Sequence, residues 1–134
     1  MSHENVELVR RLHAHRQATG DFLEPLIAHD FVWDMSTFRG WPEQQLYTGL
    51  DEARGFIRDW PAAFDDWRIE VVALHDAGAE KVVGVLHQDG RSKSTGVPVD
   101  MLYAQVYTVR DGKATRMEMY ADPDEALRAV GLAD

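Results

Sequence analysis

Asp34 is the side chain in this sequence best suited to act as a general base. It lies in the alternating segment 31–36, which predicts a strand with Val32, Asp34 and Ser36 on one face. A carboxylate held away from water has a raised pKa, which makes it a better proton acceptor near neutral pH. The alternative is an Asp34 at the rim of the fold, satisfied by backbone groups or water. The residues alone leave both roles open.

The first predicted helix brings a histidine and an arginine onto its apolar side. His13 and Arg16 share a stripe with apolar residues of the same helix: Val6, Val9 and Leu12. His13 could donate a hydrogen bond or a proton across a pocket from Asp34, and the alternative is a histidine packed in a helix–sheet contact. Arg16 lies one turn further on. It could pair with Asp34 and make that carboxylate structural.

Aromatic side chains could form the wall of a small-molecule site. Tyr47 ends an apolar loop, and it either presents its hydroxyl at a pocket mouth or seats the helix that follows. Phe56 and Trp60 lie on that helix at a spacing that suits a ligand wall and a core equally well. Trp41 could add to this wall as a lid. His87, at the end of a predicted strand, could reach the pocket entrance or lie in solvent.

Metal, phosphate-loop and thiol chemistry are not expected from this chain. His13 and His15 are two residues apart, so they diverge on a helix, and there is no His-Glu-x-x-His motif. No glycine-rich phosphate loop follows a predicted strand, and the chain contains no cysteine. We therefore expect neither a metal ion nor another cofactor.

The composition indicates one ordinary globular domain over residues 1–134. Hydrophobic residues make up 45% of the chain and charged residues 28%. A net charge of −9 argues against nucleic acid and against an anionic membrane surface as partners. No apolar run reaches the length of a membrane span, and the first residues do not form a signal peptide. We therefore expect a cytoplasmic protein that binds neither nucleic acid nor membrane.

The elements that must position these side chains follow the order helix, helix, strand, helix, four strands, helix. Helices are predicted to begin near Ser2, at Asp21 with Glu24 as a reciprocal cap, at Gly49, and after Asp122. The strand at 31–36 precedes a loop at 37–48, and further strands are predicted at 67–74, 81–87, 101–109 and 114–121. Helices followed by a run of antiparallel strands predict an α+β fold.

The last two strands are predicted to form a hairpin around Asp111-Gly112. Asp-Gly between alternating apolar runs is typical of a type I′ turn, in which both central residues have positive φ. Counting outward from the turn gives one apolar face with the pairs Val109/Ala114, Val106/Met117, Ala104/Met119 and Leu102/Ala121. The other face then carries the pairs Tyr107/Arg116, Gln105/Glu118 and Tyr103/Tyr120.

Short motifs in a characteristic order span nearly the whole chain. They occupy residues 4–11, 19–21, 32–34, 47–49, 94–99, 110–113 and 120–127, with Gly131-Leu132 at the end. This order resembles the SnoaL-like branch of the nuclear-transport-factor-two-like superfamily. The resemblance implies a cystatin-like α+β roll, in which a cone-shaped, curved antiparallel sheet packs against three N-terminal helices and a short C-terminal helix follows. The interior of such a cone is an apolar pocket.

The resemblance also implies what each face of the hairpin does. The apolar face would line the pocket through Leu102, Ala104, Val106, Met117 and Met119. The outer face, with Tyr103 and Tyr107, would form a homodimer, as is common in this superfamily.

Asp34 matches the position of the general-base Asp of the steroid isomerases in this superfamily, which implies that it points into the cone. The steroid isomerases also use a protonated Asp and a Tyr as hydrogen-bond donors, and the matching positions here are Ala104 and His13. The acid–base Asp of the SnoaL cyclases matches Met119. Neither catalytic set is complete. If Asp34 acts as a base, other side chains must stabilise the developing charge.

Two functions follow as expectations. The first is a cofactor-independent isomerase, cyclase or hydrolase acting on a small apolar carbonyl compound or epoxide. Asp34 would be its base, and His13 or Tyr47 would stabilise the developing charge. Phe56, Trp60, Met117 and Met119 would hold the apolar body of the substrate. The alternative is a binding protein that holds an apolar ligand without turning it over.

Overall fold

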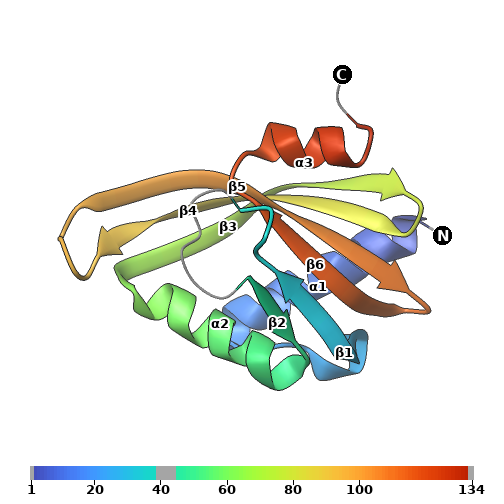
Figure 1. The fold of residues 1–134 in the computed structure, drawn as a ribbon, viewed down its shortest axis with the longest axis horizontal. Helices are drawn as coiled ribbons and strands as arrows, with labels where there is room; N and C mark the ends of the chain where they lie inside the picture. The colour runs from blue at the N-terminus through green and yellow to red at the C-terminus, as the bar shows by residue number, and fades with distance from the viewer. Residues whose placement is uncertain (1, 39–44, 133–134) are drawn as a thin grey trace.

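A computed structural model describes residues 2–38 and 45–132 of the chain (Figure 1). Its helices are α1 (Ser2–Thr19), the 3-10 turn η1 (Glu24–Leu26), α2 (Leu50–Ala62) and α3 (Pro123–Ala129). Its strands are β1 (Ile27–Asp34), β2 (Leu46–Thr48), β3 (Phe64–Gly78), β4 (Lys81–Ser92), β5 (Pro98–Arg110) and β6 (Lys113–Tyr120). The predicted α+β class is confirmed.

The six strands form one curved sheet in the order β2-β1-β6-β5-β4-β3. β1 pairs in parallel with β6, and all the other neighbours are antiparallel. The sheet is therefore mixed rather than purely antiparallel. The difference comes from β1, which is far from β6 in sequence and enters the sheet beside it.

Helices cover both faces of the sheet (Figure 1). α1 and α2 pack on the face that we call the inner face, where the large core lies. α3 packs on the opposite, outer face over a small second cluster: Val83, Ala104, Val106 and Ala126. The apolar stripe of α1 explains its position, since Val9 and Leu12 are fully buried on the inner face.

The predicted hairpin turn is confirmed, and the predicted register beyond it was wrong. Asp111 and Gly112 have φ of 54° and 75°, as a type I′ turn requires. Val109 pairs with Ala114 as expected, but Thr108 then pairs with Arg116, which leaves Thr115 as an extra residue on β6. Such a bulge moves every later pair by one position.

The bulge exchanges the two faces of β5 relative to the prediction. Tyr107 pairs with Met117 and Gln105 with Met119. Tyr103, Gln105 and Tyr107 are therefore buried on the inner face, together with both methionines. Ala104 and Val106 lie on the outer face beneath α3, so the expectation that they line the interior was wrong.

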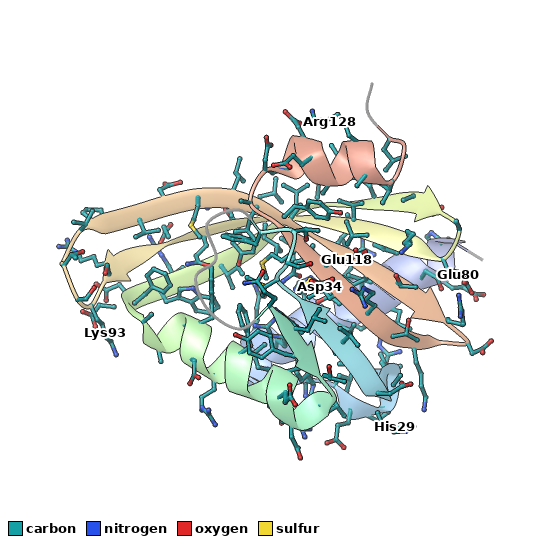
Figure 2. All side chains as sticks on the ribbon, in the orientation of Figure 1. His29, Asp34, Glu80, Lys93, Glu118 and Arg128 are labelled. Carbon is teal, nitrogen blue, oxygen red and sulfur yellow. The ribbon has the colours of Figure 1, made fainter. Side chains whose placement is uncertain are left out.

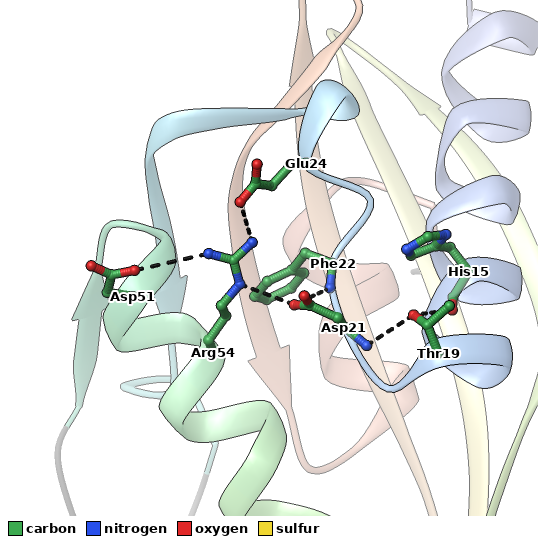
Figure 3. A network of polar contacts seen from close by, with 7 residues as sticks. All are labelled: His15, Thr19, Asp21, Phe22, Glu24, Asp51 and Arg54. Atoms are coloured by element: carbon green, nitrogen blue, oxygen red, sulfur yellow. Dashed lines mark hydrogen bonds and ion pairs between the residues drawn. The ribbon is translucent and has the colours of Figure 1, made fainter.

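The segment after α1 also differs from the prediction. The second helix is only the 3-10 turn η1, and β1 begins at Ile27 instead of residue 31. A strand, β2, lies at the end of the predicted 37–48 loop. Glu24 pairs with Arg54 of α2, and the Nε atom of Arg54 lies 3.0 Å from Oδ1 of Asp21 (Figure 3). These ion pairs connect α2 to the turn that follows α1.

Candidate functional site

A cavity of about 830 Å³ opens between the C-terminal ends of α1 and α2 and the edge strand β3. Its size lies in the range of small-molecule sites. The residues that line it come from four elements: His13, Arg16, Gln17, Ala18 and Thr19 of α1, Ile57 and Pro61 of α2, Trp67, Arg68, Ile69 and Glu70 of β3, and His87 and Asp89 of β4, with Gly20. Four consecutive β3 residues take part, so the cavity borders both faces of this strand.

His13 is buried at the inner end of the cavity, with 7% of its surface exposed. Its ring meets that of Tyr107 edge-on, with 5.9 Å between the ring centres. Burial, and next the positive charge of Arg16, lower the pKa of His13 to about 3, so its imidazole is neutral at pH 7. Its Nε2 atom has no hydrogen-bond partner within the described part of the chain.

Arg16 follows one turn after His13 and lines the same cavity. The Cζ atom of its guanidinium lies 5.5 Å from the centre of the Trp33 ring, which is a cation–π distance. Burial lowers the pKa of Arg16, and the hydroxyls of Tyr107 and Tyr103 act in the opposite direction. Among residues 2–38 and 45–132, Arg16 forms no ion pair or hydrogen bond, so its positive charge is uncompensated.

Further polar atoms are buried on the inner side of the sheet. Oε1 of Gln88 accepts hydrogen bonds from Nε1 of Trp60 at 2.7 Å and from the Tyr103 hydroxyl at 3.1 Å. Four other buried atoms have no partner among the described residues: Nε2 of Gln88, Oε1 of Gln105, Nε1 of Trp33 and Nε1 of Trp67. Each such atom costs about 1–3 kcal/mol unless a bound group satisfies it.

The carboxylates on the cavity wall are already paired. Oε1 of Glu70 lies 3.3 Å from Nδ1 of His87, whose Nε2 lies 2.9 Å from Oδ1 of Asp100. The hydrogen bond to Asp100 raises the pKa of His87. Asp89 accepts a hydrogen bond from Nε of Arg68 at 3.0 Å. The wall therefore offers one unpaired cation, Arg16, and no unpaired carboxylate among its described residues.

Asp34 does not face the interior, and the expectation that it does was wrong. Trp33 and Met35 take the inner face of β1, so Asp34 lies on the outer face, beside Glu118 of β6 (Figure 2). It is 3% exposed. Its Oδ2 pairs with the Arg116 guanidinium, and its Oδ1 accepts a hydrogen bond from the Ser36 amide at 2.8 Å. Its partner is thus Arg116, and the alternative of a pair with Arg16 was wrong.

The other predicted site residues are separated by the fold. Phe56 and Trp60 stack with 5.4 Å between ring centres, and Tyr47 meets Phe56 edge-on at 5.3 Å. These three, with Met117 and Met119, belong to the large core and do not line the cavity. Their role as ligand contacts stays a prediction, and Trp41 lies outside the described residues.

Leu102 was also expected in the interior and is instead 51% exposed on the outer face. Arg16 and Trp67 are among the cavity residues that sequence reasoning missed as ligand contacts. The signal for Arg16 was available, because an arginine on an apolar stripe needs a partner. Trp67 had no such signal.

Two negative findings apply to the described part of the chain. It contains no cluster of three or more His, Cys, Asp or Glu side chains that could hold a metal ion. None of its helices is both long and apolar enough to cross a membrane.

A family model for the SnoaL-like domain matches residues 7–117. A search among curated proteins found no match. The match covers most of the chain, including His13 and Arg16 of α1.

Solved structures share the fold over nearly the whole chain. An NTF2-like protein from Burkholderia thailandensis E264 is 27% identical, with a TM-score of 0.72 over 93% of this chain and 95% of that one. TerC, crystallised with polyporic acid, is 19% identical, with a TM-score of 0.71 over 95% and 98%. A protein named as a SnoaL-like polyketide cyclase from Jannaschia Sp. CCS1 is 19% identical, with a TM-score of 0.70 over 98% and 93%.

Proposed function

The chain belongs to the SnoaL-like domain family, and we propose that it binds a small, mostly apolar molecule in the cavity between α1, α2 and β3. The observation that carries this proposal is the cavity itself, whose wall combines apolar side chains with the guanidinium of Arg16, which has no ion pair among the described residues. Such a wall suits a ligand with an apolar body and one or two oxygen atoms. That TerC was crystallised with polyporic acid agrees with this class of ligand for the fold.

Binding is better supported than turnover, because the cavity lacks a free base among its described residues. Glu70 and Asp89 are ion-paired there. His13 is buried beside Arg16, and its pKa of about 3 makes it a weak proton acceptor. A neutral imidazole can still donate one hydrogen bond and accept another. No cofactor is part of the proposal.

The catalytic alternative is an isomerase, cyclase or hydrolase that uses Asp34 on a carbonyl compound or epoxide. It would require the substrate to reach the outer face and Arg116 to release the carboxylate. This alternative predicts that Asp34→Asn abolishes turnover. The binding proposal predicts that Asp34→Asn leaves ligand affinity in the cavity unchanged.

The binding proposal is tested by filling the cavity. Ala18 is exposed at the mouth of the cavity, whereas Ala14 is exposed on the same helix and does not line it. We expect 2-acetylnaphthalene, a small apolar carbonyl compound, to bind with a stoichiometry of one, measured by titration calorimetry. Ala18→Trp should weaken binding about tenfold or more, and the matched variant Ala14→Trp should not. Equal affinities in both variants would place the ligand elsewhere.

A further inference from the structure

Arg16 is a half-buried cation on the cavity wall that has no counter-charge among the described residues. The other arginines for which the structure gives an ion pair lie at the surface or, like Arg116, reach it: Arg54 with Asp21, Arg68 with Asp89, Arg110 with Glu80. Arg16 has no such partner within residues 2–38 and 45–132. Removing a guanidinium from water without a partner is costly, so a folded protein keeps one there only if something offsets the cost.

Contact with Trp33 offsets only part of this cost. A cation over an indole ring gains a modest electrostatic attraction, and the aliphatic stem of an arginine can also cover apolar surface. Neither contact supplies an acceptor for the five N–H donors of the guanidinium. A purely structural Arg16 would therefore have no protein acceptor for these donors among the described residues.

His13 provides a second polar side chain on the same wall. It lies three residues before Arg16, so both side chains project from one side of α1. Its Nε2 atom is buried and has no partner among the described residues. Arg16 therefore offers a charged fork to the cavity, and His13 places a neutral ring beside it.

Apolar groups line the part of the cavity next to this pair. Ile57 of α2 is buried, and Ile69 of β3 packs partly buried against the same core. The indole of Trp67 completes this side of the cavity. The arrangement suits a flat, apolar body that ends in a group with hydrogen-bond acceptors.

We propose that the ligand is an aromatic carboxylate, whose carboxyl group pairs with Arg16 beside the neutral ring of His13. A carboxylate matches the planar fork of arginine through two parallel hydrogen bonds, and it supplies the negative charge that the cavity lacks. This inference rests on the binding proposal above and specifies its ligand class. It also assigns the selectivity of the site to Arg16.

The experiment compares two probes of the same shape and different charge. We expect 2-naphthoate to bind at least about tenfold more tightly than the neutral 2-naphthamide, measured by titration calorimetry at pH 7. Raising NaCl from about 20 to about 500 mM should weaken the binding of naphthoate and leave that of naphthamide unchanged.

Variants of two arginines on the same helix assign the effect. Arg16→Gln should remove the preference for naphthoate, and Arg16→Lys, which keeps the charge without the fork, should retain part of it. Arg11 is exposed on α1 and does not line the cavity, so Arg11→Gln should keep the full preference. Circular dichroism melting curves confirm that each variant is folded.

The possible failures are distinguishable. Equal affinity of the wild-type protein for both probes would overturn the carboxylate inference and leave the binding proposal standing. A preference that survives in Arg16→Gln would overturn the role of Arg16. Absence of binding by naphthoate, naphthamide and 2-acetylnaphthalene would overturn both proposals.

Discussion

His13 and Asp34 lie on opposite faces of the sheet. His13 is buried on the inner face against Tyr107, and Asp34 pairs with Arg116 on the outer face. Two side chains separated by a sheet cannot act on the same ligand atom. The polar residues of α1 and the carboxylate of β1 therefore have separate roles, and their roles can be tested separately.

We predict a stabilising role for the pair Asp34–Arg116. The Asp34 side chain is 4% exposed and that of Arg116 39%, so loss of Arg116 leaves a buried carboxylate without its counter-charge. Arg116→Met should lower the free energy of unfolding by about 1–3 kcal/mol at pH 7, measured by urea denaturation. In the double variant with Asp34→Asn the loss should be smaller than the sum of the single losses.

A surface pair provides the control for this prediction. Arg58 pairs with Asp59, and both side chains are more than two-thirds exposed, at 76% and 73%. Arg58→Met should change stability by no more than about 0.5 kcal/mol. Losses of equal size for Arg58→Met and Arg116→Met would contradict a specific role for the buried pair.

We predict that His13 makes the fold sensitive to acid. Its pKa is lowered to about 3 in the folded chain from an ordinary value of 6.5, so below pH 6.5 the unfolded chain binds a proton that the folded chain does not. Stability from this group is complete above pH 6.5 and is lost as the pH falls toward 3. The loss is about 1.4 kcal/mol per pH unit within that window.

The contribution of His13 to this acid sensitivity is measured by comparing unfolding free energies at pH 7 and pH 4.5. His13→Gln should lose less stability across this interval than the wild type, by about 2–3 kcal/mol. His29 is exposed on β1, and His29→Gln should behave like the wild type. The same loss in His13→Gln and in the wild type would show that other groups cause the acid sensitivity.

We predict that the bulge at Thr115 can be deleted and that the next strand positions cannot. Without Thr115, strict alternation still places Ala114, Met117 and Met119 on the inner face. Deletion of Glu118 instead turns Met119 outward, against its complete burial. Circular dichroism should show a cooperative thermal transition for the Thr115 deletion and none for the Glu118 deletion. Loss of folding in both would mean that the bulge itself is required.

The expected homodimer stays a prediction, and the residues that it would use have changed. Tyr103 and Tyr107 are buried on the inner face, so they cannot form it. Leu102 is 51% exposed on the outer face and is available. Sedimentation velocity at micromolar concentration should show a dimer that Leu102→Glu dissociates. Leu132→Glu, at an exposed position after α3, should remain dimeric. A monomeric wild type would contradict the prediction.

Local chemistry made several elements predictable. The Asp111-Gly112 turn follows from the positive φ that a tight hairpin demands. The start of α3 follows from Asp122, whose Oδ1 accepts a hydrogen bond from the Asp124 amide at 2.9 Å, with Pro123 in the first turn. The burial of His13 follows from its place on the apolar stripe of α1. Each of these depends only on residues close together in the sequence.

The sequence by itself therefore determined the α+β class, the order of most elements and the polar pair on α1. Only the tertiary structure decided which sheet face is the interior, which arginine pairs with Asp34 and where the cavity opens. A single extra residue, Thr115, exchanges the faces of β5, and no local propensity marks it. The parallel pairing of β1 with β6 brings Arg116 to Asp34 across 82 residues of chain. Contacts between such distant segments depend on how the whole sheet assembles, and local patterns do not encode them.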